Sequence, residues 1–144
     1  EIKIFEEINI ALAINTPEGL VAPVIREANK KTVQDISNEI HQLTEKAIEK
    51  RLDLADLLGG TFTISNLGPY GVGVFAPVIN PPQSAIIGIG ATQKRTVIIN
   101  ENIAVRHVAT LSLVFDHRIV DGLPAAEFLQ DVKKFLETPH ILMA

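Results

Sequence analysis

The chain has 144 residues, of which 47% are hydrophobic and 21% charged, and its net charge is −4. This composition predicts a single globular domain, excludes a disordered tail, and lacks the basic stripe of a nucleic-acid binder. The absence of cysteine excludes catalysis by a thiol of the chain itself, disulfides and cysteine-based zinc sites. Because no apolar run reaches the ~18 residues that span a bilayer, we expect neither nucleic acid nor a membrane as a partner.

The first part of the chain predicts a hairpin. Residues 8–15 and 20–25 are apolar and flank a Thr-Pro-Glu-Gly turn signal, which is typical of two strands joined by a hairpin. Pro23 lies inside the second run and indicates a sheet edge or a bulge, because proline cannot donate to a strand ladder.

A helical period follows the hairpin. Over residues 32–50, apolar side chains recur every three or four positions, which predicts an amphipathic helix. Thr32 with Asp35 resembles a capping box at its start. Residues 53–58 predict a short helical turn that ends at Gly59 and Gly60.

The second part of the chain is richer in strands. We predict strands over residues 61–65, 84–91, 96–99 and 103–115, a loop over 66–82, a turn over 100–102 and a helix over about 124–137. The fold class is therefore α+β, with more strands than helices. Two substantial helices leave one face of so large a sheet under-covered, which predicts either an incomplete domain or a partner subunit.

The motif that contains the best candidates for catalytic side chains is Phe-Asp-His-Arg-Ile-Val-Asp-Gly, residues 115–122. It places His117 at a strand end, where a neutral imidazole is able to accept a proton near pH 7. Asp121, four residues later, is suited to orient the turn or to pair with an arginine. A structural ion pair in a strand-to-helix turn, with His117 a hydrogen-bonded core residue, is an equally open alternative.

Ser65 is the second candidate, at the end of the strand in Gly-Gly-Thr-Phe-Thr-Ile-Ser-Asn-Leu-Gly. Its hydroxyl is able to donate to a developing oxyanion, although the setting is not the G-x-S-x-G of a nucleophile elbow. The plainer interpretation is a polar, solvated strand face. The histidines show no metal-binding spacing, so no metal site is expected, and Gly88-Ile89-Gly90 lacks the rest of a dinucleotide fingerprint.

A third motif, Ile-Asn-Pro-Pro-Gln-Ser-Ala-Ile-Ile-Gly-Ile-Gly, stands at residues 79–90. Together with the two motifs above, it resembles one family, and the resemblance covers essentially the whole chain. The family is the catalytic (E2 core) domain of dihydrolipoamide acyltransferases in 2-oxoacid dehydrogenase complexes. The resemblance implies a chloramphenicol acetyltransferase-like mixed sheet with packed helices, assembled as homotrimers with each active site between two subunits. It implies coenzyme A as a substrate and a lipoyl group carried on a domain that this chain lacks.

The resemblance also implies roles for individual residues. His117 would be the general base that deprotonates the attacking thiol, and Asp121 would hold its loop. Ser65 of a neighbouring subunit would hydrogen-bond the oxyanion. Coenzyme A would be bound near Asn15, Asn66, Gly90 and Thr92, where Asn15 departs from the Asp of many relatives, and the region of Phe75 and Ala76 would help shape the acyl pocket.

Several further expectations follow from the resemblance. The chain, residues 1–144, would be a single catalytic domain that is incomplete at its N-terminus, and Ile141, Leu142 and Met143 would join trimers into a larger core. E1 and E3 components would bind through other domains, in a prokaryotic cytoplasm or a mitochondrial matrix. Two alternatives stay open: a scaffold-only core fragment, and an O-acetyltransferase of the same fold, although such relatives typically carry a second His where Asp116 stands.

Overall fold

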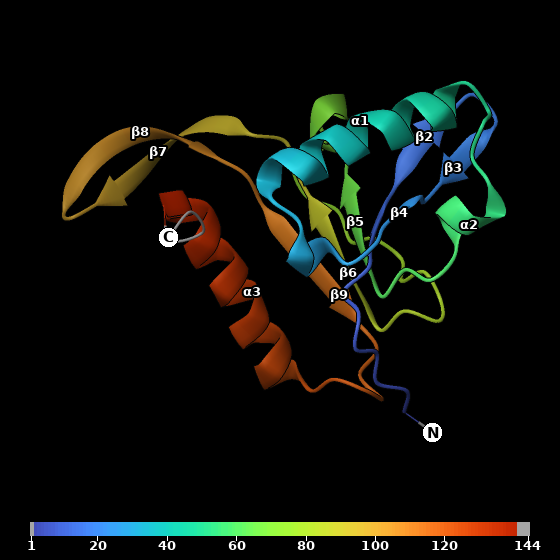
Figure 1. Cartoon of the computed structure of the whole chain (residues 1–144). Helices are drawn as coiled ribbons and strands as arrows, with labels where there is room; N and C mark the ends of the chain where they lie inside the picture. The colour runs from blue at the N-terminus through green and yellow to red at the C-terminus, as the bar shows by residue number, and fades with distance from the viewer. Residues whose placement is uncertain (1, 141–144) are drawn as a thin grey trace.

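A mixed five-stranded sheet forms the centre of the computed structural model, which describes residues 2–140 (Figure 1). In spatial order its strands are β4 (Val24–Ile25), β1 (Ile10–Leu12), β5 (Phe62–Asn66), β6 (Ala85–Ile89) and β9 (Leu111–Phe115). The three inner strands run parallel to one another, and each outer strand is antiparallel to its neighbour. The α+β prediction is therefore confirmed.

Two hairpins and three helices complete the fold. The hairpins are β2 (Ile14–Thr16) with β3 (Gly19–Val21), and β7 (Gln93–Ile99) with β8 (Asn102–Val108). The helices are α1 (Val33–Ile48), α2 (Leu54–Leu57) and α3 (Gly122–Glu137), and short 3-10 turns lie at Ala28–Lys30 and Gly68–Tyr70. The predicted helices are thus present, and the β7–β8 hairpin projects away from the sheet (Figure 1).

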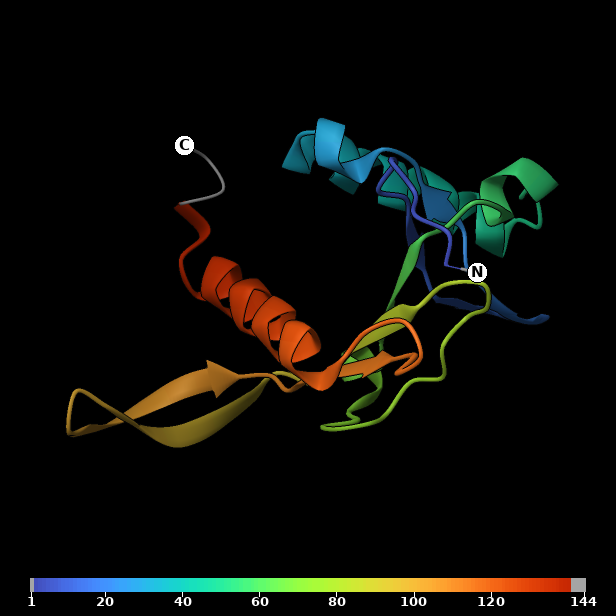
Figure 2. The ribbon, with the colours of Figure 1, turned by 90° about the horizontal axis from the view of Figure 1, so that it is seen from below.

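The two faces of the sheet are covered differently. Phe62 points to the face on which α3 packs, because its ring lies 5.7 Å from that of Phe128. Side chains alternate along a strand, so Thr63 and Ser65 point to the opposite face. Figure 2 shows α1 and α3 on one side of the sheet and the long connection between β5 and β6 on the other. The serine face is therefore covered mainly by the β5–β6 connection, whereas α1 and α3 cover the other face.

The start of α1 follows the predicted capping box. The Thr32 hydroxyl accepts a hydrogen bond from the Asp35 backbone amide at 3.1 Å, and the Asp35 carboxylate accepts one from the Thr32 amide at 3.2 Å. These bonds satisfy two of the amide donors that every helix start leaves without a partner. Leu43 and Ala47 on the predicted apolar stripe are buried, whereas Val33 is exposed.

The predicted single strand over residues 103–115 is wrong. It breaks at Ala109 and Thr110 into β8 and β9, which belong to different sheets. At this break the Thr110 carbonyl accepts the Gly90 amide at 2.9 Å, and the next amide, that of Ala91, donates to the Val72 carbonyl at 2.7 Å instead of to the strand. The run over residues 8–15 is likewise divided at Ala13, between β1 and β2.

Gly90 makes this close approach possible. A Cβ added at Gly90 would lie 2.0 Å from the Gly73 carbonyl oxygen, a distance that no side chain tolerates. The backbone of the β5–β6 connection therefore rests directly on the end of β6, and both strands of the β7–β8 hairpin leave the sheet at this point.

Asn9 joins three segments at the opposite end of the sheet and is only 4% exposed. Its Nδ2 donates to the Gly59 carbonyl at 3.0 Å and to the Glu7 carboxylate at 3.1 Å, while its Oδ1 accepts from the Glu27 amide at 2.8 Å. The Asn9 backbone also exchanges hydrogen bonds with Thr61. Asn9 thus fixes the point at which β5, the strand of Ser65, begins.

Replacing Asn9 by alanine is expected to lower the free energy of unfolding by about 1–3 kcal/mol, because it removes the partner of the Gly59 carbonyl and of the Glu27 amide in two part-buried hydrogen bonds. Urea unfolding followed by circular dichroism measures the loss. Asn38→Ala, at an exposed position of α1, is the control and should change stability by less than about 0.5 kcal/mol. Equal losses in the two variants would contradict the structural role of Asn9.

Candidate functional site

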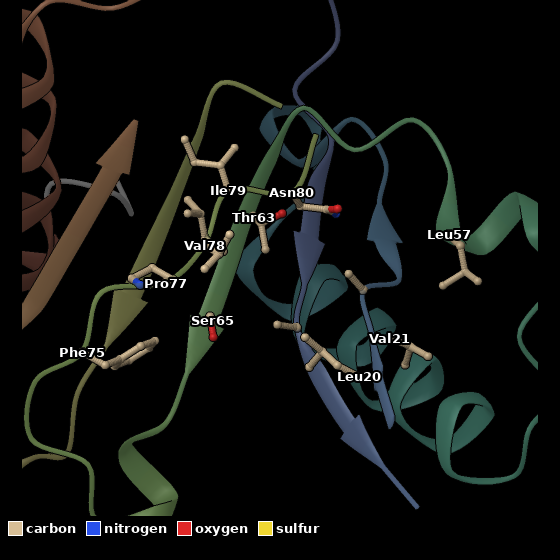
Figure 3. A pocket seen from close by; sticks show the side chains of 13 residues that line it. Leu20, Val21, Leu57, Thr63, Ser65, Phe75, Pro77, Val78, Ile79 and Asn80 are labelled. Carbon is tan, nitrogen blue, oxygen red and sulfur yellow. The ribbon is translucent and has the colours of Figure 1, made fainter. Parts of the chain in front are cut away.

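Ser65 opens onto a cavity of about 590 Å³ on the loop-covered face of the sheet (Figure 3). It is half-buried on β5 and pairs across the ladder with Gly88 of β6. Gly88 leaves room above it for two side chains, since an added Cβ would meet Phe75 at 2.9 Å and Pro77 at 3.0 Å. Phe75 is therefore held over β6 on the same face as the Ser65 hydroxyl.

The lining of this Ser65 cavity is mostly apolar. Its polar side chains are those of Thr63, Ser65 and Asn80, and none of its lining residues carries a charge. Most of the apolar side chains come from the β2–β3 region on one side and from the β5–β6 connection on the other. They include Ala13, Leu20, Phe75, Pro77, Val78 and Ile79, and Leu57 of α2 and Ile86 of β6 also line the cavity. Of the two residues expected near an acyl group, Phe75 lines the cavity, and Ala76 is not among its lining residues.

His117 lies in the turn between β9 and α3, as predicted, and lines a different cavity of about 510 Å³. Its side chain is 71% exposed, and its Nδ1 is 3.7 Å from a carboxylate oxygen of Asp121, itself 83% exposed. This separation is an ion-pair distance and is longer than a hydrogen bond. The exposure shows that His117 is not a buried core residue, and its role as a base stays a prediction.

Asp116 organises the turn that carries His117. Its carboxylate binds the Arg118 guanidinium through two oxygens, at 2.9 Å from Nε and 2.6 Å from Nη2, and also accepts the Arg118 amide at 3.0 Å. Its carbonyl accepts the amides of Ile119 and Val120, and its own amide donates to the Ser84 carbonyl at 2.8 Å. The hydrogen bonds from Arg118 lower the pKa of Asp116 to about 2.

The arginine of this turn therefore pairs with Asp116 and not with Asp121. Asp121 instead begins α3, where its carbonyl accepts the Ala125 amide at 3.2 Å. The Asp116–Arg118 pair was not predicted from the sequence, although the Asp-x-Arg spacing around His117 was a signal for it.

Within one chain, Ser65 and His117 are not brought together. Residues 75–83, which we call the dividing segment, lie between the Ser65 cavity and the His117 cavity. Ile79 lines both cavities, whereas Pro81, Pro82 and Gln83 line only that of His117. A single copy therefore places the two candidate catalytic groups in two different cavities, which share Ile79.

The four residues expected to bind coenzyme A are only partly clustered. Asn66 accepts the Gly68 amide at 2.9 Å, and an added Cβ at Gly68 would lie 3.0 Å from both the Asn66 carboxamide and the Gly90 carbonyl, so these residues are neighbours. Thr92 is exposed between β6 and β7. Asn15 is exposed on β2 opposite Leu20, in a separate part of the chain. None of the four lines the Ser65 or the His117 cavity.

Among residues 2–140, no three His, Asp or Glu side chains are grouped closely enough to hold a metal ion. No helix of the described residues is both long and apolar enough to cross a membrane.

The family of 2-oxoacid dehydrogenase acyltransferase catalytic domains matches this sequence over residues 1–144. The chain belongs to this family. The resemblance stated from the motifs is thereby confirmed, and so is the chloramphenicol acetyltransferase-like fold that the family's cores share. Ile141, Leu142 and Met143, expected to join trimers, lie outside the described residues.

Two bacterial relatives illustrate the range of the family. The chain is 42% identical, over 99% of its length, to the dihydrolipoyllysine-residue acetyltransferase component of the Rickettsia bellii pyruvate dehydrogenase complex. It is 44% identical, over 94% of its length, to the succinyltransferase component of the Rickettsia typhi 2-oxoglutarate dehydrogenase complex. The chain spans about a third of either relative, 34% in each case.

Two solved structures share the fold. A dihydrolipoamide acetyltransferase from Azotobacter vinelandii superposes with a TM-score of 0.93 at 32% identity, over 97% of this chain and 58% of that one. It was studied for the role of a serine, a histidine and an asparagine in its catalytic mechanism. The cubic core of a pyruvate dehydrogenase multienzyme complex gives the same TM-score at 33% identity, over 97% of this chain and 58% of that one.

The Asp116–Arg118 pair should make stability depend on pH. Because the folded state lowers the pKa of Asp116 from 3.8 to about 2, its ionised form stabilises the fold above about pH 4. That contribution is lost as the pH falls from about 4 toward 2. Urea unfolding of the parent and of Asp116→Asn should therefore differ by a constant amount at higher pH, and the difference should shrink over this interval.

Asp131→Asn, at an exposed position of α3, is the matched control for removal of a surface carboxylate. A difference between parent and Asp116→Asn that stays constant down to about pH 2 would contradict the assignment.

Proposed function

We propose that this chain transfers an acyl group between a dihydrolipoyl arm and coenzyme A, as part of the core of a 2-oxoacid dehydrogenase complex. The observation that carries the proposal is a shared spacing. In the Azotobacter vinelandii enzyme the histidine follows the serine by fifty-two residues and precedes the asparagine by four. Ser65, His117 and Asp121 have the same separations here, with Asp in place of Asn.

His117 is the general base in this proposal. A free thiol with a pKa of about 8.5 is mostly protonated at neutral pH, so the attacking sulfur needs a proton acceptor. His117 takes that proton, the sulfur attacks the thioester carbonyl carbon, and the leaving sulfur recovers the proton when the tetrahedral intermediate collapses. The exposure of the imidazole gives a substrate direct access to it. Asp121 near Nδ1 favours the tautomer whose Nε2 is free to accept the proton.

Ser65 stabilises the oxyanion in this proposal, and it does so from a second copy of the chain. The hydroxyl is half-buried beside an uncharged, mostly apolar cavity, where a hydrogen bond to a developing negative charge is stronger than in water. Since the dividing segment separates Ser65 from His117 within one chain, a complete site needs the Ser65 cavity of one copy against the His117 cavity of another.

Exposed apolar surface supports this assembly. On the β7–β8 hairpin, Ile98 and Ile103 face each other across the ladder and are 77% and 78% exposed. Such surface is typical of an interface rather than of a monomer. We propose homotrimers that assemble further, since a related chain builds the cubic core of a multienzyme complex. E1 and E3 components would bind through other domains.

The remaining assignments are also proposals. Residues 1–144 are treated as one catalytic domain, with coenzyme A bound near Asn66, Gly90 and Thr92 and with Asn15 as a further contact. A bacterial cytoplasm is proposed as the location because the two Rickettsia relatives are bacterial. One of these relatives is an acetyltransferase component and the other a succinyltransferase component, so they do not decide whether the acyl group is acetyl or succinyl.

Replacing His117 by alanine in the assembled protein should lower acyl transfer from acetyl-coenzyme A to dihydrolipoamide by at least about a hundredfold, because the base is lost. His41→Ala, at an exposed position of α1, is the control and should leave the rate unchanged. An unaltered rate in His117→Ala would overturn the proposed function. A parent protein that assembles without transferring acyl groups would favour the scaffold alternative.

Mixing two inactive variants tests the shared site. Ser65→Ala should lose about 10²–10³ in rate, and His117→Ala is inactive by the argument above. When both are co-expressed and assemble at random, about a quarter of the sites receive an intact serine from one copy and an intact histidine from the other. Recovery of about a quarter of the parent activity is expected, and no recovery would place both groups in one chain.

A further inference from the structure

We propose that Gln83 and Thr63 are positioning residues that fix the dividing segment and thereby set the size of acyl group that the site accepts. The proposal rests on the proposed function, because it concerns the cavity beside Ser65. It assigns a role to two side chains that neither hold a reacting atom nor supply a charge.

Thr63 is among the most deeply buried side chains of the described residues, at 2% exposure. Its hydroxyl donates to the Gln83 side-chain oxygen, which joins β5 to the end of the dividing segment. Thr63 precedes Ser65 by two residues and points to the same face of the sheet. Figure 3 shows Thr63 and Ser65 side by side on β5 along the Ser65 cavity.

Gln83 is held in place from its other side as well. An added Cβ at Gly60 would lie 2.7 Å from the Gln83 side-chain nitrogen, so the absence of a side chain at Gly60 makes room for the carboxamide. The backbone amide of Gln83 donates to the Asn80 carbonyl at 3.0 Å, and this hydrogen bond closes the turn that ends the dividing segment.

The end of the dividing segment also contacts the turn that carries His117. Gln83 lines the His117 cavity, and the carbonyl of the next residue, Ser84, accepts the Asp116 amide at 2.8 Å. Gln83 is therefore hydrogen-bonded to the strand of Ser65, and the next residue, Ser84, is hydrogen-bonded to the turn of His117. Any shift of Gln83 moves the dividing segment relative to both.

The side chains positioned in this way form part of the wall of the Ser65 cavity. Val78 and Ile79 line it a few residues before Gln83, and Ile79 also lines the His117 cavity. An apolar pocket discriminates between ligands by the space it offers, and one methylene changes its preference by roughly 10–200-fold. Because no lining residue is charged, we expect the cavity to take a small uncharged acyl group and to select it by size.

The test compares acyl donors of different length in the assembled enzyme. Thr63→Val removes the hydroxyl at nearly constant volume, and Gln83→Met removes the carboxamide at similar length. Either change should lower the ratio of kcat/KM for acetyl-coenzyme A over butyryl-coenzyme A by at least about tenfold. Thr63→Ser keeps the donor and should retain most of the parent ratio.

Thr44→Val is the matched control, since it removes a hydroxyl that donates to the Ile40 carbonyl within α1, remote from the cavity. It is expected to leave the ratio unchanged. A purely structural role for the Thr63–Gln83 pair would lower both kcat/KM values in proportion, and a constant ratio in Thr63→Val and Gln83→Met would overturn the proposal. Failure of the proposed function is distinguishable, because the parent enzyme would then transfer neither acyl group.

A second measurement does not depend on activity. In a double-mutant cycle of urea unfolding, the combined variant should lose clearly less stability than the two single losses added together, because both changes break the same bond. Strict additivity would show that the two side chains do not interact and would overturn the proposal in an active or inactive preparation.

Discussion

The parallel pairing of β5 with β6 is the constraint on which the rest of the molecule depends. Its register places Ser65 opposite Gly88, so a residue without a side chain stands beside the proposed oxyanion donor. The free space above Gly88 is filled by Phe75 and Pro77, which bring the dividing segment across the sheet. A slip of one residue in this pairing would turn Ser65 toward the helices and bury it among their apolar side chains.

The local patterns of the sequence predicted this fold well where short-range physics decides the outcome. The capping box of Thr32 and Asp35, the strand of Ser65 and the turn after Phe115 are present as expected, because each depends on neighbouring residues. The single strand over residues 103–115 was wrong, and its interruption lies where Gly90 and Ala91 contact Gly73 and Val72, far away in sequence. Long-range contacts of this kind do not produce a periodic pattern of apolar residues in the sequence, so they cannot be predicted from it.

The site was predictable to a similar degree. The positions of His117 and Ser65 at strand ends followed from the pattern of apolar residues, while their roles came from the resemblance to a family and stay predictions. The Thr63–Gln83 bond was missed because the two residues are twenty positions apart and neither is unusual in composition. The separation of the two cavities likewise depends on how the dividing segment crosses the sheet, and the secondary-structure propensities of its residues do not determine that path.

The β7–β8 hairpin has a consequence for how the protein is made in the cell. Two strands alone are marginally stable in water, and this pair presents Ile98 and Ile103 to solvent beyond the edge of the main sheet. In the proposed assembly, a newly synthesised copy therefore exposes this apolar surface until another copy covers it. If the proposed assembly forms, its yield depends on the rate of synthesis and on the local concentration of chains, because slow encounter between copies leaves time for aggregation.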